Sequence, residues 1–176
     1  MSIRFLSCAG LIMMSLPAWG WASHQGRGQV DFNGEIVEVP CNIDTNSRDQ
    51  TLSYGVVSAK SNGLQSHKAF DIKLVDCTLA SQNKPGYVYR KASIVFYGQP
   101  DPYDSSLLGV SGSAEGLGIK LLNHNQQHIV LGETHNDYEL VNGDNSIHFF
   151  TELKFNQQPL KAGEFQALLQ FVVSYF

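Results

Sequence analysis

Basic clusters are missing from this sequence. Its 12 Lys and Arg residues are scattered over 176 positions and are outnumbered by 16 Asp and Glu residues, which gives a formal net charge of -4. Aromatic residues do not alternate with the basic ones, so the sequence lacks the positive, aromatic surface that binds phosphates and bases. We therefore predict that the protein has no nucleic-acid partner.

Long hydrophobic runs are scarce as well. The apolar stretch near the N-terminus, Phe5–Leu16, is too short to span a bilayer. No later segment approaches the roughly 18 consecutive apolar residues that a transmembrane helix needs. The sequence therefore argues against an integral membrane protein.

The N-terminal residues have the pattern of a secretory signal. Arg4 supplies a positive charge, the apolar stretch Phe5–Leu16 follows, and Gly20 and Ala22 are small residues at the two positions that a signal peptidase reads. We predict a signal peptide over residues 1–22, cleaved after Ala22. Retention of this segment as an N-terminal anchor is the alternative.

Cysteine is also rare, with three residues in the chain. Cys8 would leave with the signal peptide, so the exported chain keeps Cys41 and Cys77. Two cysteines in an oxidising compartment are expected to form one disulfide, and closing this loop contributes about 4 kcal/mol in the chain-entropy model. A reactive thiol and half of a metal site are the alternatives, but neither has suitable neighbours in the sequence.

Motifs for catalysis are absent. His124 and His128 have the spacing of a helical zinc site, but they lie in a polar turn between predicted strands. The segment Gly109–Gly112 lacks the spacing of a nucleophile elbow, and Gly112–Gly118 leads into a strand rather than the helix that a phosphate loop requires. We predict no enzyme, no catalytic residue, no metal and no cofactor.

Strand patterns follow one another along the rest of the chain, with no convincing helix. Apolar and polar residues alternate in four segments, and turn residues separate them. Short strands with this spacing predict an all-β sandwich, and no repeat or linker indicates a second domain. The residues of the apolar faces are Phe70, Ile72, Leu74, Ala92, Ile94, Phe96, Leu117, Ile119, Leu121, Ile147, Phe149, Thr151, Leu153 and Phe155.

The last strand pattern continues to the final residues. Its second face is largely polar, with Glu164, Gln166, Gln170 and Ser174. An apolar strand at a free end exposes unpaired backbone groups, so we expect the domain's own sheet or another polypeptide to cover it. The unbroken apolar face comprises Phe165, Ala167, Leu169, Phe171, Val173 and Tyr175.

A second alternating segment follows the predicted signal peptide. Apolar residues and Gly34 hold the even positions from Val30 to Ile36, and apolar residues then hold the odd positions from Val37 to Cys41. A one-residue slip moves side chains to the opposite face of a sheet. We interpret the stretch as two strand segments with different partners.

Taken together and in this order, four segments resemble the pilin subunits of the bacterial chaperone-usher pathway, as in type 1 fimbriae and P pili. The similarity covers nearly all of the chain after the signal peptide. The segments are Val30–Val37 leading to Pro40 and Cys41, Phe70–Cys77, Gly116–Leu121, and Ala162–Phe176 with its penultimate tyrosine.

The resemblance implies an all-β fold, an incomplete immunoglobulin-like β-sandwich that lacks its final strand. A donor strand from a periplasmic chaperone or a neighbouring subunit would fill the hydrophobic groove along the last strand, which is a form of β-augmentation. Residues 1–22 would be the signal peptide, 23–35 the donor extension and 36–176 the pilin domain. The donor residues would be Gly26, Gly28, Val30 and Phe32, and the groove and chaperone strand would comprise Phe165, Ala167, Leu169, Phe171, Val173, Tyr175 and Phe176.

The resemblance also implies a place and a role. The subunit would pass through the periplasm with its chaperone, polymerise at an outer-membrane usher, and end in a surface fimbrium that supports adhesion. Rod subunit, tip adaptor and terminator remain open as roles along the fibre. A self-contained exported β-sandwich that binds a small ligand or a sugar is the alternative from another class.

Overall fold

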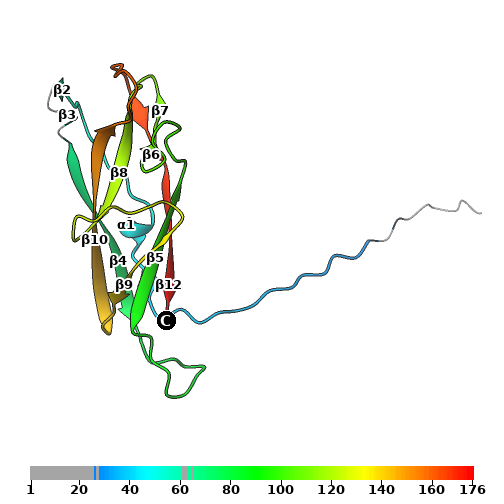
Figure 1. The fold of residues 1–176 in the computed structure, drawn as a ribbon. Helices are drawn as coiled ribbons and strands as arrows, with labels where there is room; N and C mark the ends of the chain where they lie inside the picture. The colour runs from blue at the N-terminus through cyan, green and yellow to red at the C-terminus, as the bar shows by residue number, and fades with distance from the viewer. Residues whose placement is uncertain (1–25, 27, 61–62, 65) are drawn as a thin grey trace, which may run out of the picture. The chain divides into compact units, whose positions relative to one another are not determined.

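The computed structural model describes residues 26, 28–60, 63, 64 and 66–176 (Figure 1). The predicted signal peptide and the first residues of the predicted extension lie outside the described residues. The chain divides into two units, one that ends at Glu35 and one that runs from Ile36 to Phe176. In the first unit, the described residues form no helix or strand.

The larger sheet of the second unit has five antiparallel strands in the order β1-β4-β10-β8-β6. Its centre consists of β4 (His67–Cys77), β10 (Gly143–Phe155) and β8 (Leu117–Asn123). Two very short strands, β1 (Asn42–Ile43) and β6 (Leu108–Gly109), form its edges.

The smaller sheet has three antiparallel strands in the order β12-β5-β9. They are β12 (Leu169–Tyr175), β5 (Lys91–Gly98) and β9 (Thr134–Glu139). Two short pairs accompany the sheets: β11 (Phe165–Gln166) with β7 (Ser111–Gly112), and β2 (Ala59–Lys60) with β3 (Gly63–Leu64). Figure 1 shows β5 and β12, in green and red, running side by side.

A hydrophobic core lies between the two sheets. The rings of Phe70 and Phe149 stack with their centroids 5.3 Å apart, and Phe96 from the smaller sheet meets Phe149 edge-on at 5.0 Å. Nearly all residues of the predicted apolar faces are buried, so the prediction of an all-β sandwich is confirmed. The alternation missed β9 with its buried Tyr138, and the buried Leu79, Ile129 and Leu140 outside the strands. The other buried residues of the predicted apolar faces are Ile72, Leu74, Ala92, Ile94, Leu117, Ile119, Leu121, Ile147, Thr151 and Leu153.

Three residues depart from the predicted alternation. Gly118, expected on the polar face of its strand, is buried, and a side chain there would collide with Leu107. Ser93, expected on a polar face, is only 7% exposed, because the register between β5 and β9 shifts between Ala92 and Ile94. Phe155, expected on the buried face, is 41% exposed. It is the last residue of β10 and pairs with Leu117, the first residue of β8, so it lies where the sheet ends.

The sequence predicted no convincing helix, and the structure has one short helix, α1 (Thr45–Arg48). Asp44 caps it, because the Asn46 amide donates to Asp44 Oδ1 at 3.0 Å. Ser47 is buried, and its Oγ accepts a hydrogen bond from the Lys73 amide at 3.0 Å. This hydrogen bond holds α1 against β4. A single turn is too short to show helical periodicity in the sequence.

The segment Val37–Cys41, interpreted as the second of two strand segments, is not a strand. Val37 and Val39 are exposed, and regular pairing begins only with β1. Pro40 has no N–H to donate to a ladder. Its carbonyl accepts one hydrogen bond, from the Thr78 amide at 2.8 Å.

The prediction of an unbroken strand from Phe165 to Tyr175 is wrong in one respect. The structure divides it into β11 and β12, because β11 pairs with β7 whereas β12 pairs with β5. Gly112 in β7 permits the first pairing, since its φ is +132° and a side chain there would collide with the Glu164 carbonyl. Ala167 and Leu168 lie in the break.

Candidate functional site, an open edge beside the last strand

β12 is an edge strand, and one side of its backbone has no partner strand among the described residues. Phe176 and Lys91 exchange two main-chain hydrogen bonds of 3.0 Å. Because such pairs recur at every second residue of an antiparallel ladder, the even-numbered residues of β12 bond to β5. The odd-numbered residues therefore direct their N–H and C=O groups away from β5, to what we call the open edge.

The same odd-numbered residues direct apolar side chains towards the core. Each of them packs on the core but is only partly buried. The ring of Phe171 lies 6.4 Å from that of Phe96, and burial raises the pKa of Tyr175. The open edge thus combines unpaired main-chain groups with an incompletely covered apolar row, which one further strand would complete. The row comprises Leu169, Phe171, Val173 and Tyr175.

Most of the residues predicted for the groove wall lie together. Phe165 packs on the core beside the apolar row of β12. Ala167 is exposed in the break before β12, and Phe176 is exposed just beyond its end. Contact of these residues with a chaperone stays a prediction.

The sequence analysis missed the segment that faces the start of the C-terminal strands. Tyr54 and Val57 are partly buried against the core. The Tyr54 ring lies 5.7 Å from that of Phe165, and its hydroxyl donates to Thr151 Oγ1 at 2.6 Å. Burial raises the pKa of Tyr54. Gly55, with a φ of +63°, interrupts any alternation here, so a short apolar cluster was the only signal in the sequence.

The predicted donor residues lie in the unit that ends at Glu35. Val30 is 73% exposed and Phe32 is 92% exposed. A side chain added at Gly26 or Gly28 would meet no atom within 4 Å. The described structure of this unit therefore gives no local reason for glycine or for apolar residues at these four positions, and their donor role stays a prediction.

The first residues of the second unit are held by the loop that follows β4. The Glu38 carboxylate accepts hydrogen bonds from the Gln82 amide at 2.6 Å, Ser81 Oγ at 2.7 Å and Asn83 Nδ2 at 3.3 Å. These hydrogen bonds, that of Gln82 above all, lower the pKa of Glu38.

The predicted disulfide is present, and it joins Cys41 to Cys77. Both residues are buried. Cys41 immediately precedes β1, which pairs with β4 through only Asn42 and Ile43. The disulfide therefore fastens the beginning of the domain to a central strand where the ladder is short.

The histidines considered for a metal site have different neighbours. His128 Nε2 donates to the Ser106 carbonyl at 2.8 Å, whereas the His124 ring lies 6.4 Å from that of Tyr138. Within the described part of the chain, no group of three or more His, Cys, Asp or Glu residues could hold a metal ion.

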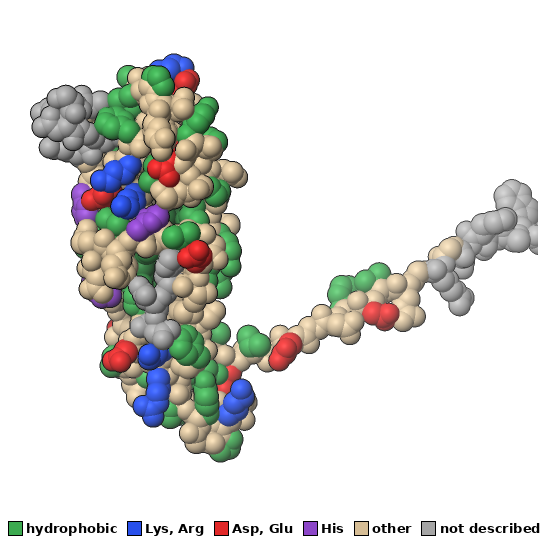
Figure 2. All heavy atoms as spheres, in the orientation of Figure 1, with side chains coloured by type: hydrophobic (Ala, Val, Ile, Leu, Met, Phe, Trp, Pro, Cys, Tyr) green, Lys and Arg blue, Asp and Glu red, His purple; other side chains and the backbone are tan. Residues whose placement is uncertain are grey.

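No helix among the described residues is long and apolar enough to cross a membrane. Figure 2 shows acidic and basic side chains interspersed on the visible face of the second unit.

Comparison with known proteins places this geometry in context. The model of the fimbrial protein family matches residues 30–176. The F7-2 fimbrial protein of Escherichia coli is 32% identical over 181 residues, which cover 95% of this chain and 96% of the relative. The crystal structure of the P pilus rod subunit PapA has a TM-score of 0.68 at 24% identity and covers 78% of this chain and 100% of that one.

A second solved structure is that of a chaperone-usher pilus and reveals the molecular basis of rod uncoiling. Its matching chain has a TM-score of 0.67 at 26% identity. The match covers 86% of this chain and 97% of that one. Pilin structures of this kind have an incomplete immunoglobulin-like fold, so the likeness confirms the predicted fold.

Proposed function

Since this chain belongs to the fimbrial protein family, whose members are structural proteins and not enzymes, we propose that it joins its neighbours by donor-strand exchange. Residues 23–35 of one subunit would lie along the open edge of the next. The open edge supports this proposal, because its main-chain groups and apolar row together need one more strand. Val30 and Phe32, both exposed in the chain itself, would supply the side chains that cover the row.

Two further partners follow from the same edge. An exported subunit with an unpaired apolar edge would aggregate, so a periplasmic chaperone first covers β12 with a strand of its own. An outer-membrane usher then exchanges that strand for the extension of the next subunit. The assembled chain becomes part of a surface fimbrium and supports adhesion.

Along the fibre, we place this subunit in the rod. One of the solved structures that resemble this chain, at 26% identity, comes from a chaperone-usher pilus whose rod uncoils. A self-contained sandwich that binds a ligand is disfavoured, because its sheet would not end on a half-covered apolar strand.

A peptide displacement experiment tests strand exchange directly. The subunit is purified with its chaperone and mixed with a synthetic peptide of residues 23–37. We expect the peptide to displace the chaperone, and a peptide with Asp in place of Phe32 to be inactive. Equal displacement by both peptides, or by neither, contradicts the proposal.

A further inference from the structure

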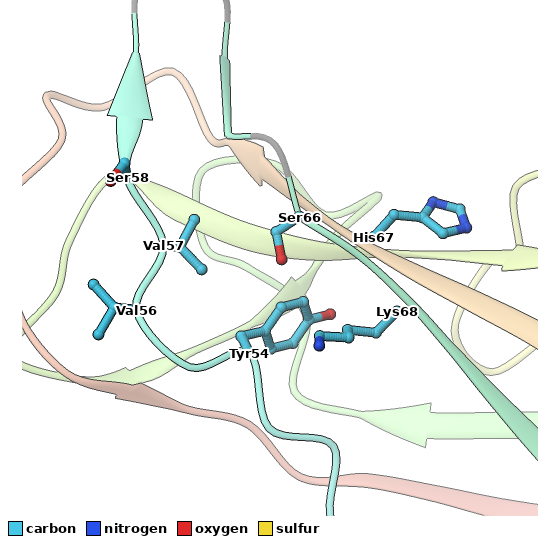
Figure 3. Close-up of a pocket in the computed structure, with 7 residues that line it drawn as sticks. All are labelled: Tyr54, Val56, Val57, Ser58, Ser66, His67 and Lys68. Carbon is cyan, nitrogen blue, oxygen red and sulfur yellow. The ribbon is translucent and has the colours of Figure 1, made fainter.

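A polar pocket lies next to the point where the C-terminal strands begin. Its volume is about 350 Å³, and it opens between the irregular segment before β2 and the first residues of β4 (Figure 3). Two valines contribute apolar surface, and the other lining side chains carry three hydroxyl groups, an imidazole ring and an ammonium group. The lining residues are Tyr54, Val56, Val57, Ser58, Ser66, His67 and Lys68.

Lys68 supplies the positive charge of this pocket. It lies in β4 on the same face as the buried Phe70, and it pairs in register with Thr151. Figure 3 shows its side chain and the Tyr54 ring directed towards one another, whereas the His67 ring points away. His67 instead contacts Glu152 at 3.4 Å.

The ammonium group of Lys68 has no carboxylate partner among the described residues. Two other lysines have one: Lys154 lies 2.8 Å from Glu152, and Lys161 lies 2.5 Å from Glu115. Lys68 is exposed, lies on the strand face that carries Phe70 and lines the same pocket as Ser58 and Ser66, so it is suited to a carboxylate that comes from outside the domain.

The pocket adjoins the end of the open edge at which an inserted strand would leave it. Tyr54, which lines the pocket, contacts Phe165, and β12 begins four residues later at Leu169. A donor strand antiparallel to β12, the more stable arrangement, runs from Tyr175 towards Leu169. The residues that follow the donor segment of the neighbour therefore emerge beside the pocket.

Side-chain phase restricts which neighbour residue arrives there. Val30 and Phe32 must face the core opposite odd-numbered residues of β12, because side chains of directly opposite residues lie on one face of the sheet. If Phe32 lies opposite Phe171, Glu35 lies opposite Leu168, in the break just before β12. Outside the paired strand, the alternation of side chains no longer fixes the direction of the Glu35 side chain, so its carboxylate is free to turn towards Lys68.

The charge of the donor region is complementary to the pocket. Between Gly28 and Ser47 the sequence contains Asp31, Glu35, Glu38 and Asp44 but no Lys or Arg. Glu38 is already bound to the loop after β4, and Asp31 lies within the donor segment on its outer face. Glu35 is the remaining carboxylate at the correct end.

We infer that the pocket around Lys68 binds the carboxylate of Glu35 from the neighbouring subunit and so selects the neighbour's extension. This inference rests on the proposed strand exchange, since only an inserted extension brings Glu35 there. The pair adds a charge requirement to the apolar fit of Val30 and Phe32.

Charge reversal tests the pair in assembled fibres. Lys68→Glu and Glu35→Lys each place two like charges together at every junction, and the double variant restores opposite charges. We expect each single variant to dissociate about 2- to 10-fold faster in warm detergent than wild type, and the double variant to return close to wild type. High salt should shrink the differences. Asp31→Lys is the matched control: it changes a carboxylate that does not reach the pocket, so it should not rescue Lys68→Glu, and that double variant should dissociate as fast as Lys68→Glu alone.

Each failure has a separate meaning. Wild-type dissociation of both single variants, or additive loss in the double variant, overturns the Lys68–Glu35 pair. If Lys68→Glu is weakened and Glu35→Lys is not, the pocket binds a different anion and the inference is wrong. Phe32→Asp serves as the independent check, because normal fibres from that variant refute strand exchange itself. Co-purification of Lys68→Gln with the chaperone shows that a change at this position leaves the domain folded.

Discussion

Replacing Phe32 by Asp separates strand donation from folding. Phe32 is 92% exposed in the chain itself, so the subunit's own fold does not depend on its burial. In the proposed fibre the same side chain leaves water and covers the apolar row of β12. Only the second process should therefore respond to the substitution.

The size of the effect follows from the change in burial. Transfer of a phenylalanine side chain from water to an apolar site contributes about 1.5–3 kcal/mol, which is roughly a 10- to 150-fold change in the equilibrium for insertion. Aspartate removes that contribution and also brings an unpaired charge into the apolar site, which costs more. We expect Phe32→Asp subunits to be nearly absent from fibres.

Two measurements on the same cells test this expectation: co-purification of the subunit with its chaperone, and its amount in sheared fibres. Phe32→Asp should accumulate normally with the chaperone and be lost from fibres. Phe32→Leu keeps most of the buried apolar area and is the matched control, with near-normal fibres. If Phe32→Asp instead fails to accumulate with the chaperone, residues 23–35 belong to the subunit's own fold and the donor assignment is wrong.

Three other substitutions and one deletion probe the domain. Cys41→Ser should lower the yield of exported subunit, because loss of such a disulfide costs about 2–5 kcal/mol; wild-type protein that can be alkylated without reduction would contradict this. Deletion of residues 173–176 should abolish co-purification with the chaperone, since it removes half of the open edge, whereas Tyr175→Ala should only weaken it. Tyr138→Phe should raise stability by up to about 1 kcal/mol, because the buried Tyr138 hydroxyl has no hydrogen-bond partner among the described residues. Burial raises the pKa of Tyr138 to about 12, above its unfolded value, so wild type should lose stability relative to Tyr138→Phe as pH rises towards 12; unfolding curves between neutral and alkaline pH test both effects.

The core could be predicted because it depends on a local pattern. In β4, β8 and β10, an apolar residue at every second position is enough to identify the buried face, and the structure buries those residues except Phe155 at the end of β10. The disulfide could be predicted because only two cysteines remain after the predicted signal peptide. Neither inference needs knowledge of which strands become neighbours.

The features that the sequence did not reveal depend on contacts between distant segments. Tyr54 is fixed by Thr151, which lies 97 residues later, and no periodicity within either segment indicates that contact. The break between β11 and β12 arises because β7 and β5 offer two different partners. The pocket around Lys68 likewise exists only where β4 meets the segment before β2.

The Cys41–Cys77 bridge has a mechanical consequence for the proposed fibre. Tension from a neighbour would reach each domain through its extension and would pull first at β1, whose two residues form a ladder that can open one bond at a time. The covalent bridge diverts that force to the end of β4, an eleven-residue strand paired with β10 over most of its length. Shear on the fibre would therefore load the many hydrogen bonds between β4 and β10 together, instead of opening the short β1 ladder one bond at a time. The hydrogen bonds of Glu38 lie closer to the extension, so they would break before the β4 ladder is loaded and could re-form when the tension falls.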